Sequence, residues 1–255
     1  MTHPAKTTKM VVANFKTQVS YASSKAYIKS LSTLLAAGGK KKEASFDNIV
    51  ICPPFPYLHL FKESDLLSHN IKLGAQDCSS CAGLPLTGDI TPSMLKDFQV
   101  SHVVLGHSER LLHLKEAKRL IKKKVETALH AGLTPILCVG EPSWVKEAGT
   151  TDAYLTNQLT AMLPATCSKI TLAYEPLWAV GTGKTPDPST LESVLKHLRH
   201  YATLRGMTCT LLYGGSVDAK NCGAFFNLEE LDGVLVGKAS LKPDALLAMA
   251  RQGRL

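Results

Sequence analysis

The sequence has no apolar run approaching the ~20 residues that a bilayer-spanning helix needs. Its first residues, MTHPAKTTK, are polar and lead directly into MVVANF, so the apolar core of a secretion signal is missing. No Ser-rich or Pro-rich linker divides the chain. These absences argue against a membrane protein. They predict one soluble, cytoplasmic domain over residues 1–255, a length that α/β barrels reach as a single domain.

Cysteine spacing gives little support for a metal or a disulfide framework. The seven cysteines are odd in number, and most lie in apolar runs, as buried thiols in a reducing cytosol would. Cys78 and Cys81 form a single CxxC pair with no second Cys or His pair at zinc spacing. We therefore expect ordinary thiols in this segment and no bound metal.

Positive charge is present in excess, with a formal net charge of +8 and lysine runs at residues 40–42 and 122–124. The basic residues are scattered, and no basic segment interspersed with aromatic residues accompanies them, which argues against nucleic-acid binding. Solvated lysines on helix faces account for most of the excess. A general attraction for anionic small molecules is compatible with it.

Eight apolar runs of strand length recur along the chain. They are rich in Val, Ile and Leu, as parallel strands buried on both faces are. They cover residues 10–15, 48–52, 71–76, 102–106, 134–140, 170–175, 208–214 and 233–237. Amphipathic patterns between them predict helices, among them residues 25–35, 116–129 and 189–204.

Strands that alternate with helices pair in parallel through right-handed crossovers, and eight of them close a barrel. The alternative is an open, doubly wound sheet, but no GxGxxG follows the first strand. We therefore predict an α/β fold, a single (β/α)8 barrel.

Polar residues follow five of the predicted strands, at the barrel end where chemistry collects. Each alone also fits a role without catalysis, since a lone Lys16 is more often a surface lysine and a lone His107 is more often a packed or exposed histidine. Together they bring a base, an electrophile, a cation and glycine turns to one rim. They are Asn14 and Lys16, then His107, Ser108, Glu109 and Arg110, then Glu175, then Gly214, Gly215 and Ser216, then Gly237 and Lys238.

The stretch 170–185, ITLAYEPLWAVGTGKT, ends an apolar strand in Glu175 and continues into a Gly-Thr-Gly loop. This design suits a general base that a mobile loop covers once the substrate arrives. Glycine turns after strands seven and eight indicate a phosphate site. A base with an electrophile beside such a site predicts proton abstraction next to a carbonyl in a small phosphorylated substrate.

Motifs over essentially the whole chain resemble those of triosephosphate isomerases. These motifs occur along the chain in the same order as in the family and include NFK, GAQD…TGDITPSML, HVVLGHSER, PILCVGE, AYEPLWAVGTGKT, YGGSV and VLVGKASL. The resemblance implies a TIM barrel that interconverts dihydroxyacetone phosphate and D-glyceraldehyde 3-phosphate through an enediolate, in glycolysis and gluconeogenesis.

The resemblance also implies residue roles. Glu175 would move the proton between two carbons while a neutral His107 polarises the carbonyl oxygen. Lys16 and Asn14 would stabilise the enediolate and hold the substrate, and Glu109 would anchor the Lys16 region. Backbone N–H groups would bind the phosphate at Gly181, Ser216, Gly237 and Lys238. No metal or cofactor is implied, because positioned charges stabilise the oxyanion.

Two loops complete the family pattern. A lid at about 176–185 would press Val180 against the carboxylate from one side, opposite Leu235. The loop at about 77–89 would enter a second subunit, forming a homodimer with Thr87 near the partner's active site.

The chain departs from the family pattern at several positions, and the departures bear on rate and stability rather than on reaction type. The family's GNWK reads ANFK, with Ala13 and Phe15, and Lys238 stands where glycine is usual. Leu111 replaces an arginine, and Pro186 ends the lid.

Two alternatives stay open: a barrel that binds a phosphate metabolite without turnover, and a different barrel enzyme acting on a sugar phosphate. The catalytic residues argue against the first and the complete GTGK lid against the second.

Overall fold

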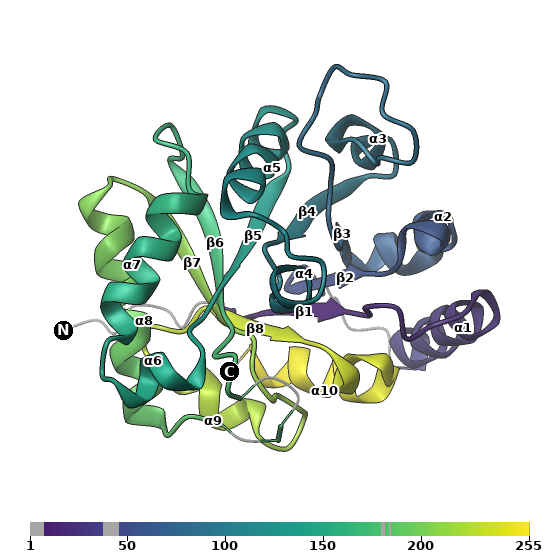
Figure 1. Cartoon of the computed structure of the whole chain (residues 1–255). Coiled ribbons are helices and arrows are strands. Elements are labelled where there is room, and N and C mark those ends of the chain that lie inside the picture. Colours follow the sequence, from purple (N-terminus) through teal and green to yellow (C-terminus); the bar gives the residue numbers. More distant parts are fainter. Residues whose placement is uncertain (1–7, 38–45, 180–181, 184, 255) are drawn as a thin grey trace.

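The computed structural model describes residues 8–37, 46–179, 182–183 and 185–254. Within these ranges eight strands form a closed barrel in chain order, each parallel to the next, and β8 pairs with β1 (Figure 1). The strands are β1 (Met10–Asn14), β2 (Ile49–Cys52), β3 (Lys72–Ala75), β4 (Val100–Leu105), β5 (Thr134–Val139), β6 (Lys169–Tyr174), β7 (Thr208–Tyr213) and β8 (Gly233–Val236). Each lies within or overlaps a predicted run, so the predicted barrel is confirmed.

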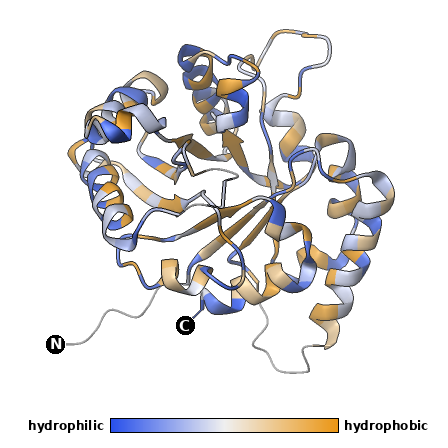
Figure 2. Ribbon diagram, turned by 60° about the horizontal axis from the view of Figure 1, so that its bottom comes forward, coloured by the Kyte–Doolittle hydropathy of each residue, from blue (hydrophilic) through white to orange (hydrophobic). Residues whose placement is uncertain are grey.

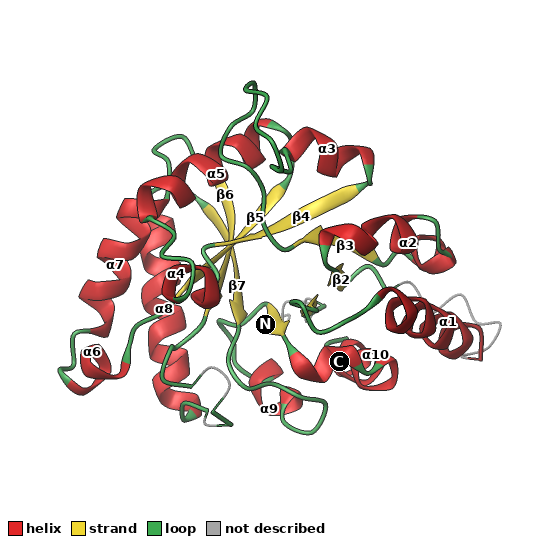
Figure 3. Cartoon of the chain, turned by 45° about the vertical axis from the view of Figure 1, so that its right-hand side comes forward, coloured by secondary structure: helices red, strands yellow, loops and turns green. Residues whose placement is uncertain are grey.

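Helices surround the strands on the outside of the barrel (Figure 3). The α-helices are α1 (Tyr21–Ala37), α2 (Leu58–Lys62), α3 (Pro92–Asp97), α4 (Ser108–Leu112), α5 (Lys118–His130), α6 (Ser143–Glu147), α7 (Thr151–Met162), α8 (Pro188–Leu204), α9 (Cys222–Phe226) and α10 (Pro243–Gln252). Three short 3-10 helices are η1 (Phe55–Tyr57), η2 (Asp65–His69) and η3 (Lys238–Leu241). The three predicted helices correspond to α1, α5 and α8, and α1 begins earlier than its pattern indicated.

The strands consist largely of hydrophobic residues (Figure 2). Two separate layers of core bury their two faces. The inner layer contains strand residues alone, which places it inside the barrel. The outer layer joins the other face of the strands to the helices. The inner layer consists of Val12, Val50, Cys52, Val104, Ile136, Cys138, Ala173, Leu212 and Leu235.

Backbone pairing continues past the carboxyl ends of several strands. The N–H of Glu175 donates to Val139 O at 2.7 Å, and the N–H of Gly214 donates to Tyr174 O at 2.8 Å. Residues that follow β5, β6 and β7 are thereby held at one rim of the barrel. This rim is where the sequence places its polar residues.

None of the described helices combines the length and apolar character that would let it cross a membrane.

Candidate active site

The side chains of Glu175 and His107 meet at the rim formed by the carboxyl ends of the strands. Glu175 Oε1 lies 3.3 Å from His107 Nε2, and Oε2 accepts the backbone N–H of Ser108 at 3.3 Å. The carboxylate is 2% exposed, and a carboxylate so buried needs hydrogen-bond donors of this kind. The two residues predicted from separate motifs as base and electrophile therefore face each other.

Two glycines make room for Glu175. A Cβ at Gly140, after β5, would lie 1.8 Å from the carbonyl oxygen of Glu175. A Cβ at Gly214, after β7, would lie 2.7 Å from Glu175 Cγ. Any larger residue at either position would displace the carboxylate or its backbone, so the neighbouring strand ends set its position.

Hydrogen bonding indicates which nitrogen of His107 carries the proton. His107 is the N-cap of α4, and its Nδ1 accepts the backbone N–H of Glu109 at 3.2 Å. A nitrogen that accepts this bond has no proton of its own. The Glu109 carboxylate is more distant, at 3.5 Å from Nδ1. A neutral imidazole with its proton on Nε2, on the side of Glu175, fits these contacts.

Lys16 is held in a conformation that few non-glycine residues adopt. Its φ is 50°, in the left-handed region, where strain usually marks a functional constraint. Its N–H donates to Asn14 Oδ1 at 3.0 Å, and its carbonyl accepts from Gln76 Nε2 at 2.9 Å. Its Nζ donates to Glu109 Oε1 at 2.6 Å. Hydrogen bonds to the backbone and to the side-chain nitrogen of Lys16 therefore fix the position of its ammonium group.

A cavity of about 770 Å³ opens over these groups. It is lined by Asn14, Lys16, His107 and Glu175 and continues along the loops after β7 and β8. Gly215, Ser216, Gly237 and Lys238 belong to this loop wall. The N–H groups of Gly215, Ser216 and Lys238 donate to no acceptor in the described part of the chain, so they are free to bind an anion.

The segment that follows Glu175 is fixed at its start. Trp178 Nε1 donates to Glu141 Oε1 at 2.8 Å, and the hydroxyl of Tyr174 donates to the same oxygen at 3.0 Å. The hydroxyl of Ser216 donates to the carbonyl of Ala179 at 3.2 Å, which links the loop after β7 to this segment. The predicted residues Val180 and Gly181 lie outside the described residues.

Comparison with known proteins identifies the family. The family model described as triosephosphate isomerase matches residues 9–253. The chain belongs to the triosephosphate isomerase family. It is an isomerase that interconverts dihydroxyacetone phosphate and glyceraldehyde 3-phosphate, a reaction of glycolysis.

Individual members of the triosephosphate isomerase family match over most of their length. The enzyme of Xanthomonas oryzae pv. oryzae (strain PXO99A) is 42% identical over 212 residues, which is 80% of this chain and 84% of the relative. That of Dictyoglomus thermophilum is 38% identical over 247 residues, 93% of this chain and 96% of the relative. That of Alkalilimnicola ehrlichii is 36% identical over 220 residues.

Three residues near the site were not singled out from the sequence. Gln76 lies in the GAQD motif and also binds Cys52 O at 3.0 Å, which ties Lys16 to β2. Glu141 ends the PILCVGE motif and receives the bonds described above. Cys138, read as an ordinary buried thiol, lies beside Glu175: burial raises the pKa of its thiol well above the ordinary value, and the Glu175 charge and a hydrogen bond to it add to the shift. Membership of a family motif was the available signal for all three.

A buried network of ion pairs holds the base of loop 77–89. Lys124 Nζ binds both carboxylate oxygens of Asp77, at 2.8 and 2.7 Å, and also binds Glu116. Arg110 bridges the same two acids, at 2.8 Å from Asp77 and 3.1 Å from Glu116. Thr87, the residue expected near a partner's active site, is exposed in the outer part of this loop.

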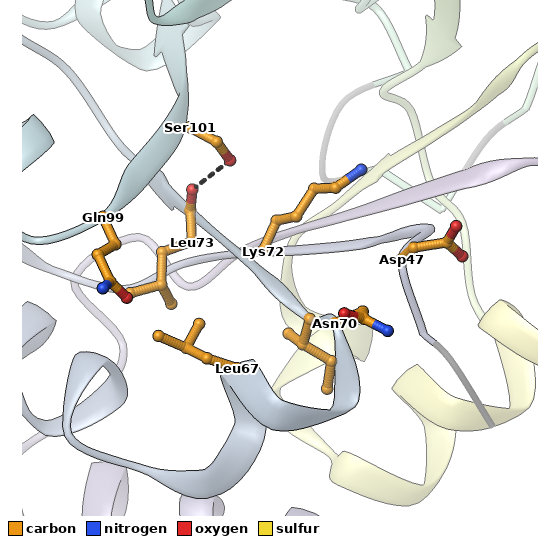
Figure 4. Close-up of a pocket in the computed structure, with 8 residues that line it drawn as sticks. Asp47, Leu67, Asn70, Lys72, Leu73, Gln99 and Ser101 are labelled. Atoms are coloured by element: carbon orange, nitrogen blue, oxygen red, sulfur yellow. Dashed lines mark hydrogen bonds between the residues drawn. The ribbon is translucent and has the colours of Figure 1, made fainter.

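A second cavity, of about 460 Å³, opens at the opposite end of the barrel, beside the first residues of β3 and β4 (Figure 4). The Ser101 hydroxyl there donates to Leu73 O at 3.0 Å. Its other polar residues, Asp47, Asn70, Lys72 and Gln99, are exposed. No sequence-predicted catalytic residue lines it. Among the described residues, no group of three His, Cys, Asp or Glu side chains could hold a metal ion.

Proposed function

We propose that Glu175 is the base that moves a proton between the two carbons of the triose phosphate. It takes the proton from the carbon next to the carbonyl, which forms the enediolate, and returns it to the neighbouring carbon, while the hydroxyl proton passes to the former carbonyl oxygen. The observation that carries this proposal is the contact of 3.3 Å between the Glu175 carboxylate and His107 Nε2 over one cavity. Triosephosphate isomerases are a standard example of such a base paired with a neutral imidazole.

His107 and Lys16 stabilise the charge that develops on oxygen. The Nε2 proton of His107 donates to the carbonyl oxygen as that oxygen becomes negative. The ammonium of Lys16 lies on the same cavity and adds its positive charge, and Asn14 orients it through the backbone bond of 3.0 Å. Glu109 holds the ammonium in place. Hydrogen-bond donors that are already in position, in a site that excludes water, lower the energy barrier to charge developing on oxygen the most. They do so because they need no reorganisation during the reaction.

The substrate phosphate binds the backbone amides of Ser216, Gly237 and Lys238, with Gly181 contributing from the lid. The free N–H groups on the loop wall of the cavity support this assignment. The lid at 176–185 closes over the bound substrate, with Val180 and the cavity residue Leu235 on either side of the carboxylate. Closure excludes water and keeps the enediolate phosphate from losing its phosphate group.

Residues 1–255 form one catalytic domain, which works in the cytoplasm in gluconeogenesis as well as in glycolysis. The domain assembles as a homodimer through loop 77–89, with Thr87 near the active site of the partner. Leu84 and Leu86, on this loop, are 63% and 45% exposed, and apolar side chains gathered on an exposed loop tip are typical of a contact surface.

An isomerase assay on Glu175→Gln tests the proposed base. The amide has the shape of the carboxylate but cannot accept the proton, so turnover should fall by roughly 10²- to 10⁴-fold. The matched control is thermal stabilisation by 2-phosphoglycolate, which should persist because the phosphate amides are unchanged. Turnover above a tenth of the wild-type value would remove Glu175 from the proposed role.

Sizing of the double variant Leu84→Asp, Leu86→Asp tests the dimer. Two charges at the loop tip should yield monomers with reduced turnover, whereas Leu204→Asp, on a leucine that is 74% exposed on α8, should leave the dimer intact. A wild-type chain that elutes as a monomer at micromolar concentration would contradict this part of the proposal.

A further inference from the structure

The active-site cavity extends well beyond the groups that the reaction needs. A triose phosphate has only about ten non-hydrogen atoms, whereas cavities of several hundred Å³ hold drug-sized ligands. This one encloses about 770 Å³. Its outer part runs from the loop after β7 to the start of α10. The side chains of Lys220, Lys238 and Lys242 line that part.

These three lysines are exposed, and none has a carboxylate within 4 Å among the described residues. The two acids on the same wall, Asp218 and Asp244, form no ion pair with them within 4 Å. Asp218 accepts the N–H groups of its own turn, from Lys220 at 2.8 Å and Asn221 at 3.0 Å. Asp244 lies in the first turn of α10, where the helix dipole favours a negative charge. Within the described ranges, the outer part of the cavity therefore has three ammonium groups without ion-pair partners.

Lys238 adds its side chain at the edge of the proposed phosphate site. Glycine is usual at this position in the family pattern noted from the sequence, whereas this chain has a lysine. The loop that carries it is fixed, because the Ser240 hydroxyl shares its one proton between Gly237 O, at 2.7 Å, and Val236 O, at 3.1 Å. A fixed backbone with a free cationic side chain can bind one anion through its amides and attract a second with its ammonium.

We propose that Lys220, Lys238 and Lys242 form a second anion subsite, which binds the outer phosphate of a small bisphosphorylated molecule. The inner phosphate of that molecule occupies the amide site assigned to the substrate, so this inference rests on the proposed function. Such a molecule competes with the triose phosphate and inhibits the enzyme. The ammonium groups select it over a monophosphate of the same carbon skeleton.

A matched pair of probes tests the subsite: 1,3-propanediol bisphosphate and 1,3-propanediol monophosphate, which differ only in the second phosphate. Calorimetry measures their binding to the full chain, and the isomerase assay measures their inhibition. We expect the bisphosphate to bind about 10-fold more tightly at low ionic strength, one molecule per site, because exposed ion pairs each contribute a small attraction. The preference should shrink in 0.5 M salt, which screens exposed charges.

Substitution assigns the preference to the lysines. In the double variant Lys238→Met, Lys242→Met the bisphosphate should bind no more than about 2-fold more tightly than the monophosphate. Lys123→Met, which removes an exposed lysine on α5 outside the cavity, should keep the wild-type ratio. The ratio of the two affinities corrects for any change in the substrate phosphate site, because both probes bind that site.

The outcomes separate the two proposals. If the wild-type protein turns over substrate and binds the monophosphate, but binds the bisphosphate no more tightly, the proposal of a second subsite alone is overturned. Equal preference in the wild type and in the double variant also overturns it, because the lysines would then have no part. Failure to bind the monophosphate and to isomerise triose phosphate would instead overturn the phosphate site and the proposed function.

Discussion

The titration of His102 should make the stability of this protein depend on pH between about 4 and 6.5. His102 lies in the first half of β4, at the end of the barrel opposite the catalytic rim, and is 7% exposed. Burial lowers the pKa of its imidazole from 6.5 to about 4, and the charges of Lys72 and Lys169 add to the shift. The folded protein therefore resists a proton that the unfolded chain accepts.

Proton linkage gives the direction and the size of the change in the free energy of unfolding with pH. Between pH 6.5 and 4 the unfolded chain binds more protons at this residue than the folded protein, so unfolding becomes easier as the pH falls. The stability is complete above pH 6.5 and is lost as the pH falls through the folded pKa. The pKa difference of roughly 2.5 units corresponds to about 3 kcal/mol at most, since one unit equals about 1.4 kcal/mol. Below pH 4 both states are protonated and the loss stops.

Urea denaturation of the wild type and of His102→Gln at several pH values between 7.5 and 4 measures this effect. Glutamine is polar and does not titrate, so the gap between the two free energies of unfolding should narrow by about 3 kcal/mol as the pH falls. His113→Gln, which removes an exposed histidine, should run parallel to the wild type. Parallel curves for His102→Gln as well would refute the reasoning.

Two further substitutions test how the structure holds its loops. Lys124→Met should lower the free energy of unfolding in urea by about 3 to 5 kcal/mol, because it leaves Asp77 buried beside another acid without its closest cation. Lys123→Met, on the exposed side of α5, should change this free energy little. A loss below about 1 kcal/mol in Lys124→Met would contradict the prediction. Asp187→Ala should lower the free energy of unfolding in the same measurement, because the Asp187 carboxylate caps α8 by accepting the N–H of Thr190 at 2.9 Å, and Asp187→Asn should recover most of that loss. Equal losses in both variants would show that the charge matters rather than the cap.

The sequence alone was sufficient for the barrel and for bringing its polar residues to one rim. Eight apolar runs with helical patterns between them leave few ways to bury both faces of every strand, and closure into a barrel is one of them. Because parallel strands all end at the same rim, the residues after each strand had to converge. The sequence placed Glu175 and His107 together in this way. They are far apart along the chain: Ser108, the residue after His107, is 67 positions from Glu175.

Only the tertiary structure decided how those residues are held and what surrounds them. The left-handed backbone of Lys16 depends on an amide from Gln76, and the thiol of Cys138 lies against Glu175. Such contacts join different strands at a particular register, and neither apolar periodicity nor residue spacing specifies a register to that accuracy. The extent of the cavity and the presence of three lysines along its outer part depend in the same way on where separate loops lie in space, which the order of residues along the chain does not define.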